Sequence, residues 1–167
     1  MILGMSLATF TMVHVVISLV AIVAGLIVMF GMLGSNRTPG LTAIFLLLTI
    51  LTSATGFLFP FTQLLPSHMI GILSLVLLAI ACIALYAMNL SGAWRWIYVL
   101  TALISLYLNV FVLVIQSFLK IPALTAVAPG NPPSGPVFAV VQGLVLVFFV
   151  LMTIGAIRRF RPMPAFA

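Results

Sequence analysis

Few side chains in the long apolar stretches of this chain could take part in chemistry, and none is a carboxylate. The chain contains no Asp and no Glu. Paired-carboxylate hydrolysis, Ser-His-Asp catalysis, carboxylate proton relays and hard-cation cages therefore lack the side chain they need. An enzyme would depend on its imidazoles or on a bound cofactor, so we predict no catalytic residue. The candidate ligand-binding residues are His14, Ser18, His68, Asn109, Gln116, Lys120 and Gln142.

Polar residues recur at helical spacing in two of the apolar stretches. At about 3.6 residues per turn, positions three, four and seven apart share one face of a helix. In one stretch such a stripe comprises Tyr98, Thr101, Ser105, Asn109, Gln116 and Lys120. In the first stretch a stripe of smaller residues comprises His14, Ser18, Ala21 and Gly25. A polar stripe in lipid faces other helices or a cavity, so it predicts interhelical hydrogen bonds or a ligand site.

Three kinds of ligand suit this set of imidazoles, amides and one cation. A b-type haem would take His14 and His68 as axial metal ligands, with Lys120 near a propionate. A quinone, or another lipid head group, would need only a histidine and an amide. Copper could be held by Met12, His14, His68 and Met69, because thioethers and imidazoles are soft ligands. The two histidines differ in predicted depth by roughly 9 Å, which disfavours their sharing a haem.

The elements that must position these residues are apolar runs long enough to cross a bilayer. Of the 167 residues, 65% are hydrophobic and 4% are charged, and a soluble fold of that composition could not cover its surface. A spanning helix needs about 20 apolar residues. We predict an all-α bundle, one transmembrane domain over 1–167, with five helices at roughly 8–33, 41–60, 68–90, 97–119 and 136–157. The first run is too long for a signal-peptide core, so we interpret it as a membrane helix.

The breaks between the runs carry further expectations. The longest break, 120–136, holds five prolines and is predicted to be a loop. Ser67 is expected to be the N-cap of the third helix, which would place His68 in the first turn at a wet interface. The aromatic residues Trp94, Trp96 and Tyr98 are expected at the other interface.

The distribution of charge predicts the orientation. With five spans, every cation except Lys120 falls on one side of the membrane: Arg37, Arg95, Arg158, Arg159 and Arg161. The positive-inside rule makes that side cytoplasmic, so the N-terminus is predicted outside and the C-terminus inside. The candidate ligand-binding residues then share the outer half. We interpret the net charge of +6 as this topology signal, and we expect contact with the lipid bilayer and none with nucleic acid.

Several short stretches carry a resemblance to a known family. They are TGFLFPF at 55–61, LPSH at 65–68 with GILSLV at 71–76, and GAWRW at 92–96 with LNVFV at 108–112. These stretches resemble an uncharacterised family of small bacterial multi-pass inner-membrane proteins, and the likeness would cover most of the chain. The resemblance implies a bacterial inner membrane as the location. It carries over no activity and no catalytic or binding residue.

Two functions from different classes remain open. The first is a non-catalytic accessory or assembly subunit of a larger membrane complex, because the chain is small and lacks carboxylates. Its partners would be other membrane protein subunits or further copies of the chain. The second is a small membrane protein that binds haem or quinone in the outer half of the bundle. A transporter is disfavoured, because coupling carboxylates and an internal repeat are both missing.

Overall fold

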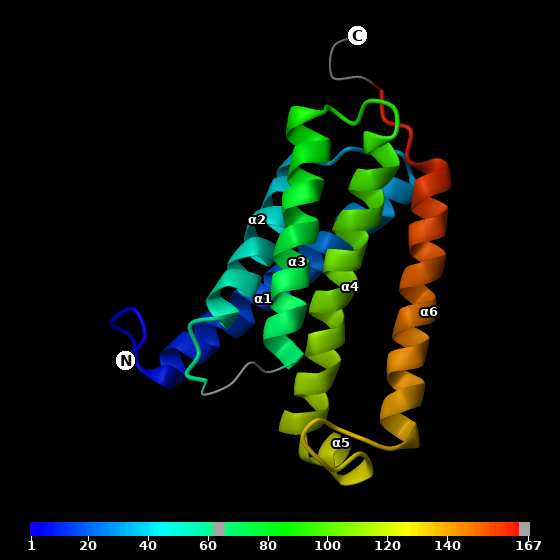
Figure 1. The fold of residues 1–167 in the computed structure, drawn as a ribbon. Coiled ribbons are helices and arrows are strands. Elements are labelled where there is room, and N and C mark those ends of the chain that lie inside the picture. The colour runs from blue at the N-terminus through cyan, green and yellow to red at the C-terminus, as the bar shows by residue number, and fades with distance from the viewer. Residues whose placement is uncertain (62–65, 164–167) are drawn as a thin grey trace.

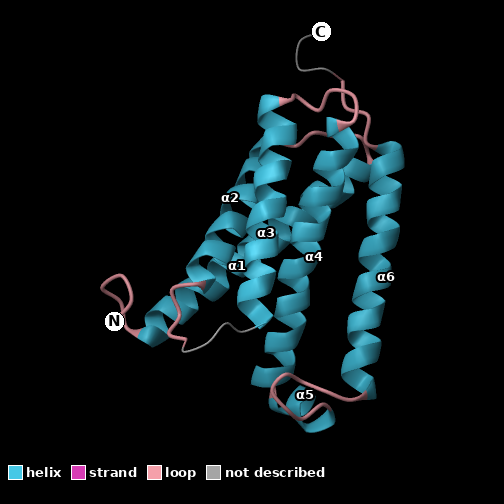
Figure 2. Ribbon diagram, in the orientation of Figure 1, coloured by secondary structure: helices cyan, strands magenta, loops and turns pink. Residues whose placement is uncertain are grey.

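The computed structural model describes residues 1–61 and 66–163, and this part of the chain is helical, with no strand. Leu65, in the LPSH stretch, lies outside the described residues. Figures 1 and 2 show helices joined by short loops. In chain order they are α1 (Leu7–Leu33), α2 (Pro39–Gly56), α3 (Pro66–Cys82), the π-helix η1 (Ile83–Ala87), α4 (Trp94–Lys120), α5 (Pro122–Val127) and α6 (Pro136–Arg159).

Five helical segments in the described part are long and apolar enough to span a membrane, namely α1, α2, α3 continued by η1, α4 and α6. The predictions of an all-α structure and of five spanning helices are therefore confirmed. Large hydrophobic side chains on the outside of the bundle remain exposed, as on α6, where Val140, Leu144 and Leu151 face outward. Such a surface is suited to lipid contact. The chain has the fold of a multi-pass membrane protein.

Local sequence signals explain where the helices begin. The Ser6 hydroxyl accepts a hydrogen bond from the Thr9 amide at 3.1 Å and caps α1. Pro39 and Pro136 occupy the first positions of α2 and α6, where a missing amide proton costs nothing. The predicted N-cap at Ser67 is wrong, because α3 already begins at Pro66.

Two predicted segments differ from the structure. The second helix ends at Gly56 instead of 60, where glycine meets an aromatic run that leads to a proline. The break at 120–136 is not all loop, because it contains the short helix α5. Pro122 can start a helix, and the Thr125 hydroxyl donates to the Phe118 carbonyl at 2.7 Å, which ties α5 to the end of α4.

The helix α4 lies at the centre of the bundle and contacts α1, α2, α3 and α6. Its Val99, Ala102, Leu103 and Leu106 side chains are fully buried. The helix α1 crosses obliquely behind α3 and α4 (Figure 1). Its close approach depends on Gly25, where an added Cβ would lie 2.6 Å from Leu106 Cδ1 and 2.8 Å from Phe45 Cδ2. At Gly25, the stripe of smaller residues on α1 therefore serves helix packing.

The N-terminus lies at one end of the bundle, and the described residues after α6 lie at the other, as Figure 1 shows. The loops after α1 and η1 and the segment after α6 lie at one end, which we call the arginine end because it holds Arg37, Arg95, Arg158, Arg159 and Arg161. Tyr98 was expected at this interface but is buried, with 2% of its surface exposed. Its ring packs 6.1 Å from that of Phe160, which follows α6 and covers it.

Candidate functional site

A small polar cavity lies among α1, α2, α3 and α4, in the half of the bundle nearer the N-terminus. Its volume is about 120 Å³. Among the described residues no Lys or Arg lines it, and hydroxyls, an amide and an imidazole supply its polar atoms. We call it the outer cavity, and its lining residues are His14, Ser18, Thr52, Ser53, Gly56, Ser67, Ile70, Gly71, Ser74, Leu108, Asn109 and Val112.

Asn109 on α4 reaches across the cavity wall to α1. The Ser18 hydroxyl donates to Asn109 Oδ1 at 2.9 Å. The other end of the amide, Nδ2, is buried and has no hydrogen-bond partner among the described residues. The Thr52 hydroxyl, which also lines the cavity, is buried without a partner in the same way. Buried polar groups are normally paired, so each of these two atoms lacks a usual partner among the described residues.

His14 contacts the end of α2 through its ring nitrogen. Its Nδ1 lies 2.8 Å from Thr55 Oγ1. The single proton of that hydroxyl is already directed to the Leu51 carbonyl at 2.6 Å. This geometry favours the neutral tautomer in which His14 Nδ1 donates to Thr55 Oγ1 and Nε2 keeps its lone pair as an acceptor. The edge of the imidazole packs on Phe59, with ring centroids 5.2 Å apart.

The structure brings three of the seven candidate residues to the outer cavity, namely His14, Ser18 and Asn109. His68 lies just outside, between the rings of Phe57 and Phe61, at centroid distances of 5.5 and 4.3 Å. It was expected to be wet, but only 6% of its surface is exposed. The aromatic residues after α2 cover it, which the sequence pattern did not reveal.

The remaining three candidates lie elsewhere. Gln142 on α6 donates through Nε2 to the Phe111 carbonyl at 3.1 Å, so it joins α6 to another face of α4. Gln116 and Lys120 are exposed near the end of α4. The predicted polar stripe on α4 therefore does not form one site. Asn109 lines the cavity, whereas Gln116 and Lys120 lie on the exposed surface. The other end of the stripe, at Thr101 and Ser105, bonds back to carbonyls one turn earlier on the same helix.

Some cavity residues were missed as candidates, although a signal for them exists. Ser67, Gly71 and Ser74 line the cavity from α3 and are four and three positions apart, which places them on one helix face. Gly71 also permits close packing, because an added Cβ would lie 3.1 Å from the Phe57 ring. The same spacing rule that identified the stripes on the first and fourth helices would have found this third stripe.

The outer cavity does not fit a haem. His14 Nε2 could serve as an axial ligand, but no second histidine, cysteine or methionine lines the cavity. A volume of about 120 Å³ is also well below the 300 Å³ or more of a typical cofactor pocket. The predicted copper site is not supported either, because Met12 and Met69 are exposed. No cluster of three or more His, Cys, Asp or Glu side chains occurs among residues 1–61 and 66–163.

Comparisons with known proteins add no further assignment. No protein-family model, no curated protein and no solved structure matches the chain. The class that the fold defines is a multi-pass helical membrane protein. Any narrower function must be argued from the cavity and its orphan polar atoms.

Proposed function

We propose that this protein binds the head group of a quinone in the outer cavity. The observation that carries the proposal is that two residues lining one cavity, Asn109 and Thr52, each have a buried polar atom without a partner among the described residues. Asn109 Nδ2 is a donor suited to a quinone carbonyl. A ligand that accepted this hydrogen bond would remove a desolvation cost of about 1–3 kcal/mol.

The neighbouring imidazole of His14 could also bind the reduced form of the ligand, a quinol. The Nε2 lone pair of His14 is an acceptor for a hydroxyl, because Nδ1 is already committed to Thr55. A donor and an acceptor in one cavity suit both the carbonyl of a quinone and the hydroxyl of a quinol. The absence of charged lining residues favours such a neutral head group over a free acid.

The size and the walls of the cavity agree with this ligand class. A volume of about 120 Å³ corresponds to about four water molecules at liquid density, or to one small ring. Ile70, Leu108 and Val112 supply the apolar part of the lining. The isoprenoid tail would extend along the lipid-facing surface. We place this activity in a bacterial inner membrane, with the arginine end in the cytoplasm.

Binding of a short-chain benzoquinone to the detergent-purified full chain tests the proposal. Titration calorimetry should show saturable binding by the wild type. Asn109→Leu removes the orphan donor at nearly constant volume and should weaken binding about tenfold, the equivalent of one hydrogen bond. Gln142→Met is the matched control, because it removes a buried amide that does not line the cavity. It should bind like the wild type.

Two results would contradict the quinone proposal. One is a wild-type protein that binds no benzoquinone. The other is equal weakening by Asn109→Leu and Gln142→Met, which would mean that any lost helix–helix hydrogen bond has the same effect. An absorption spectrum with a Soret band in the purified protein would return the assignment to haem, with His14 as its ligand.

One observation favours the accessory-subunit function as a second candidate. The helix α6 is the least covered of the five spans, and Ala139 and Gly143 lie one turn apart on its exposed surface. An added Cβ at Gly143 would meet nothing within 4 Å. Small residues four apart allow another membrane helix to approach closely. Leucine at both positions should release a partner subunit or second copy in a native gel and leave quinone binding unchanged.

A further inference from the structure

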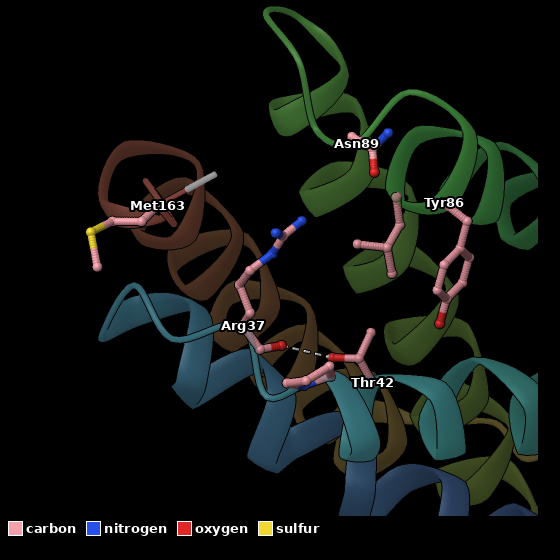
Figure 3. A pocket seen from close by; sticks show the side chains of 7 residues that line it. Arg37, Thr42, Tyr86, Asn89 and Met163 are labelled. Atoms are coloured by element: carbon pink, nitrogen blue, oxygen red, sulfur yellow. Dashed lines mark hydrogen bonds between the residues drawn. The ribbon is translucent and has the colours of Figure 1, made fainter. Parts of the chain in front are cut away.

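A second, larger hollow opens at the arginine end of the bundle, far along α2 and α3 from the outer cavity. Its volume is about 450 Å³. Figure 3 shows the Arg37 side chain extending into it, with Met163 on one side, Asn89 and Tyr86 on the other, and Thr42 beside the Arg37 backbone. We call it the arginine cleft, and it is lined by Arg37, Pro39, Thr42, Leu85, Tyr86, Asn89 and Met163.

Arg37 enters the cleft from a fixed backbone position. The buried Thr42 side chain donates from Oγ1 to the Arg37 carbonyl at 3.1 Å, and the Thr42 amide bonds to the Thr38 carbonyl at 2.9 Å. These contacts anchor the start of α2 directly behind the arginine. Arg37 as a whole residue is half-buried, and its guanidinium makes no hydrogen bond or ion pair with any residue in the described part of the chain.

Residues 1–61 and 66–163 contain no Asp or Glu side chain that could pair with Arg37. Arg95 shows the alternative use of a cation at this end. Its Nη1 donates to the carbonyls of Ile157 and Phe160 at 2.9 and 2.6 Å and so caps the C-terminus of α6. Arg37 has no such carbonyl partner, and it faces an open cleft.

The opposite wall of the cleft supplies two neutral donors. The π-helix η1 carries Tyr86, and Asn89 follows two residues after it. Both side chains are exposed, so the phenol and the amide are accessible. Together with the guanidinium, they offer donors from two separate parts of the chain around one space. This set matches a tetrahedral oxyanion, which accepts several hydrogen bonds at once.

We propose that the arginine cleft binds a phosphate group that carries a net negative charge. Arg37 is the charged anchor, and Tyr86 and Asn89 complete the site. The phosphate belongs to the head group of an anionic phospholipid or to a free phosphate, which share this chemistry. The arginine end is predicted to face the cytoplasm, where anionic lipid attracts basic residues. This site is separate from the outer cavity and does not depend on quinone binding.

The test compares lipids bound to the full chain in detergent by native mass spectrometry. Phosphatidylglycerol should bind to the wild type about tenfold more tightly than zwitterionic phosphatidylcholine, as expected for one charge-assisted contact. Arg37→Gln should abolish that preference. Arg158→Gln is the matched control, because it removes the same charge from an exposed position outside the cleft. It should change the preference by no more than about fivefold, the effect of one surface charge.

Competition identifies the source of the phosphate. If inorganic phosphate displaces phosphatidylglycerol, the anion alone is recognised, and if it does not, the lipid is the ligand; each result supports the site. Equal binding of the two lipids by the wild type overturns the proposal, and this comparison needs no variant. Equal loss in Arg37→Gln and Arg158→Gln also overturns it. Arg37→Lys should retain part of the preference, which guards against a folding defect in Arg37→Gln.

Discussion

The outer cavity and the arginine cleft show two ways in which a chain without carboxylates uses its polar residues. In the outer cavity, neutral groups from different helices bond to one another, as in the pairs His14–Thr55 and Ser18–Asn109. In the arginine cleft, Arg37 is left without a partner in the described structure. Neutral donors and acceptors can pair with one another inside a bundle, whereas a guanidinium that has no carbonyl partner favours an anion. The difference predicts a neutral ligand for the cavity and an anionic ligand for the cleft.

The largest expected effect comes from a change that should break both regions at once. Gly25 lies between them on α1, and its missing side chain lets α1 approach Leu106 and Phe45, both fully buried. Gly25→Leu should lower the free energy of unfolding by about 3 kcal/mol, because overpacking forces neighbouring helices apart. Thermal unfolding in detergent measures this loss, and binding of quinone and of phosphatidylglycerol should fall together. Gly143→Leu, on an open face, should lower neither the free energy of unfolding nor the binding of these two ligands.

A smaller effect should separate the structural arginine from the ligand-binding one. Arg95→Ala removes charge-assisted hydrogen bonds to the end of α6 and should cost about 2 kcal/mol of stability. The preference for phosphatidylglycerol should survive, since Arg95 does not line the cleft. Hydrogen exchange should accelerate in the last turn of α6. Arg159→Ala, at an exposed position, is the control, and an equal loss of stability there would refute the capping role of Arg95.

The smallest expected effect concerns a polar contact that belongs to neither region. Gln142→Met breaks the bond to the Phe111 carbonyl and should cost about 0.6 kcal/mol, the average for an interhelical hydrogen bond in a membrane. Chemical denaturation in mixed micelles can resolve this change. Binding at both regions should stay at the wild-type level. A large loss of quinone binding would instead extend the outer site to α6.

Much of the fold could be predicted from the sequence, because each spanning helix corresponds to a continuous apolar run. The first helix was expected at 8–33 and occupies Leu7–Leu33, and the last was expected at 136–157 and occupies Pro136–Arg159. Each depends on a continuous apolar run bounded by turn-forming or charged residues. The helix α5 was missed, because its prolines indicated a loop and its contact with Phe118 is not visible in composition.

The candidate site could be predicted only in part. Helical spacing selected Ser18 and Asn109, and the structure shows that they bond to each other. The same rule also selected Gln116, which is exposed, and it missed Ser74, which lines the cavity. Spacing states which residues share a face of one helix. It does not state which neighbour that face meets.

By itself, the sequence determined the class of protein: the apolar runs require spanning helices, and the missing carboxylates exclude whole groups of mechanisms. Only the tertiary structure decided which polar atoms are paired and which are orphaned. His14 Nδ1 lies within hydrogen-bond distance of Thr55 Oγ1, and Asn109 keeps one nitrogen without a partner among the described residues. The physical reason is that hydropathy acts along the chain, within a single helix. Hydrogen bonds between helices depend on the rotation and crossing of neighbours that are distant in sequence.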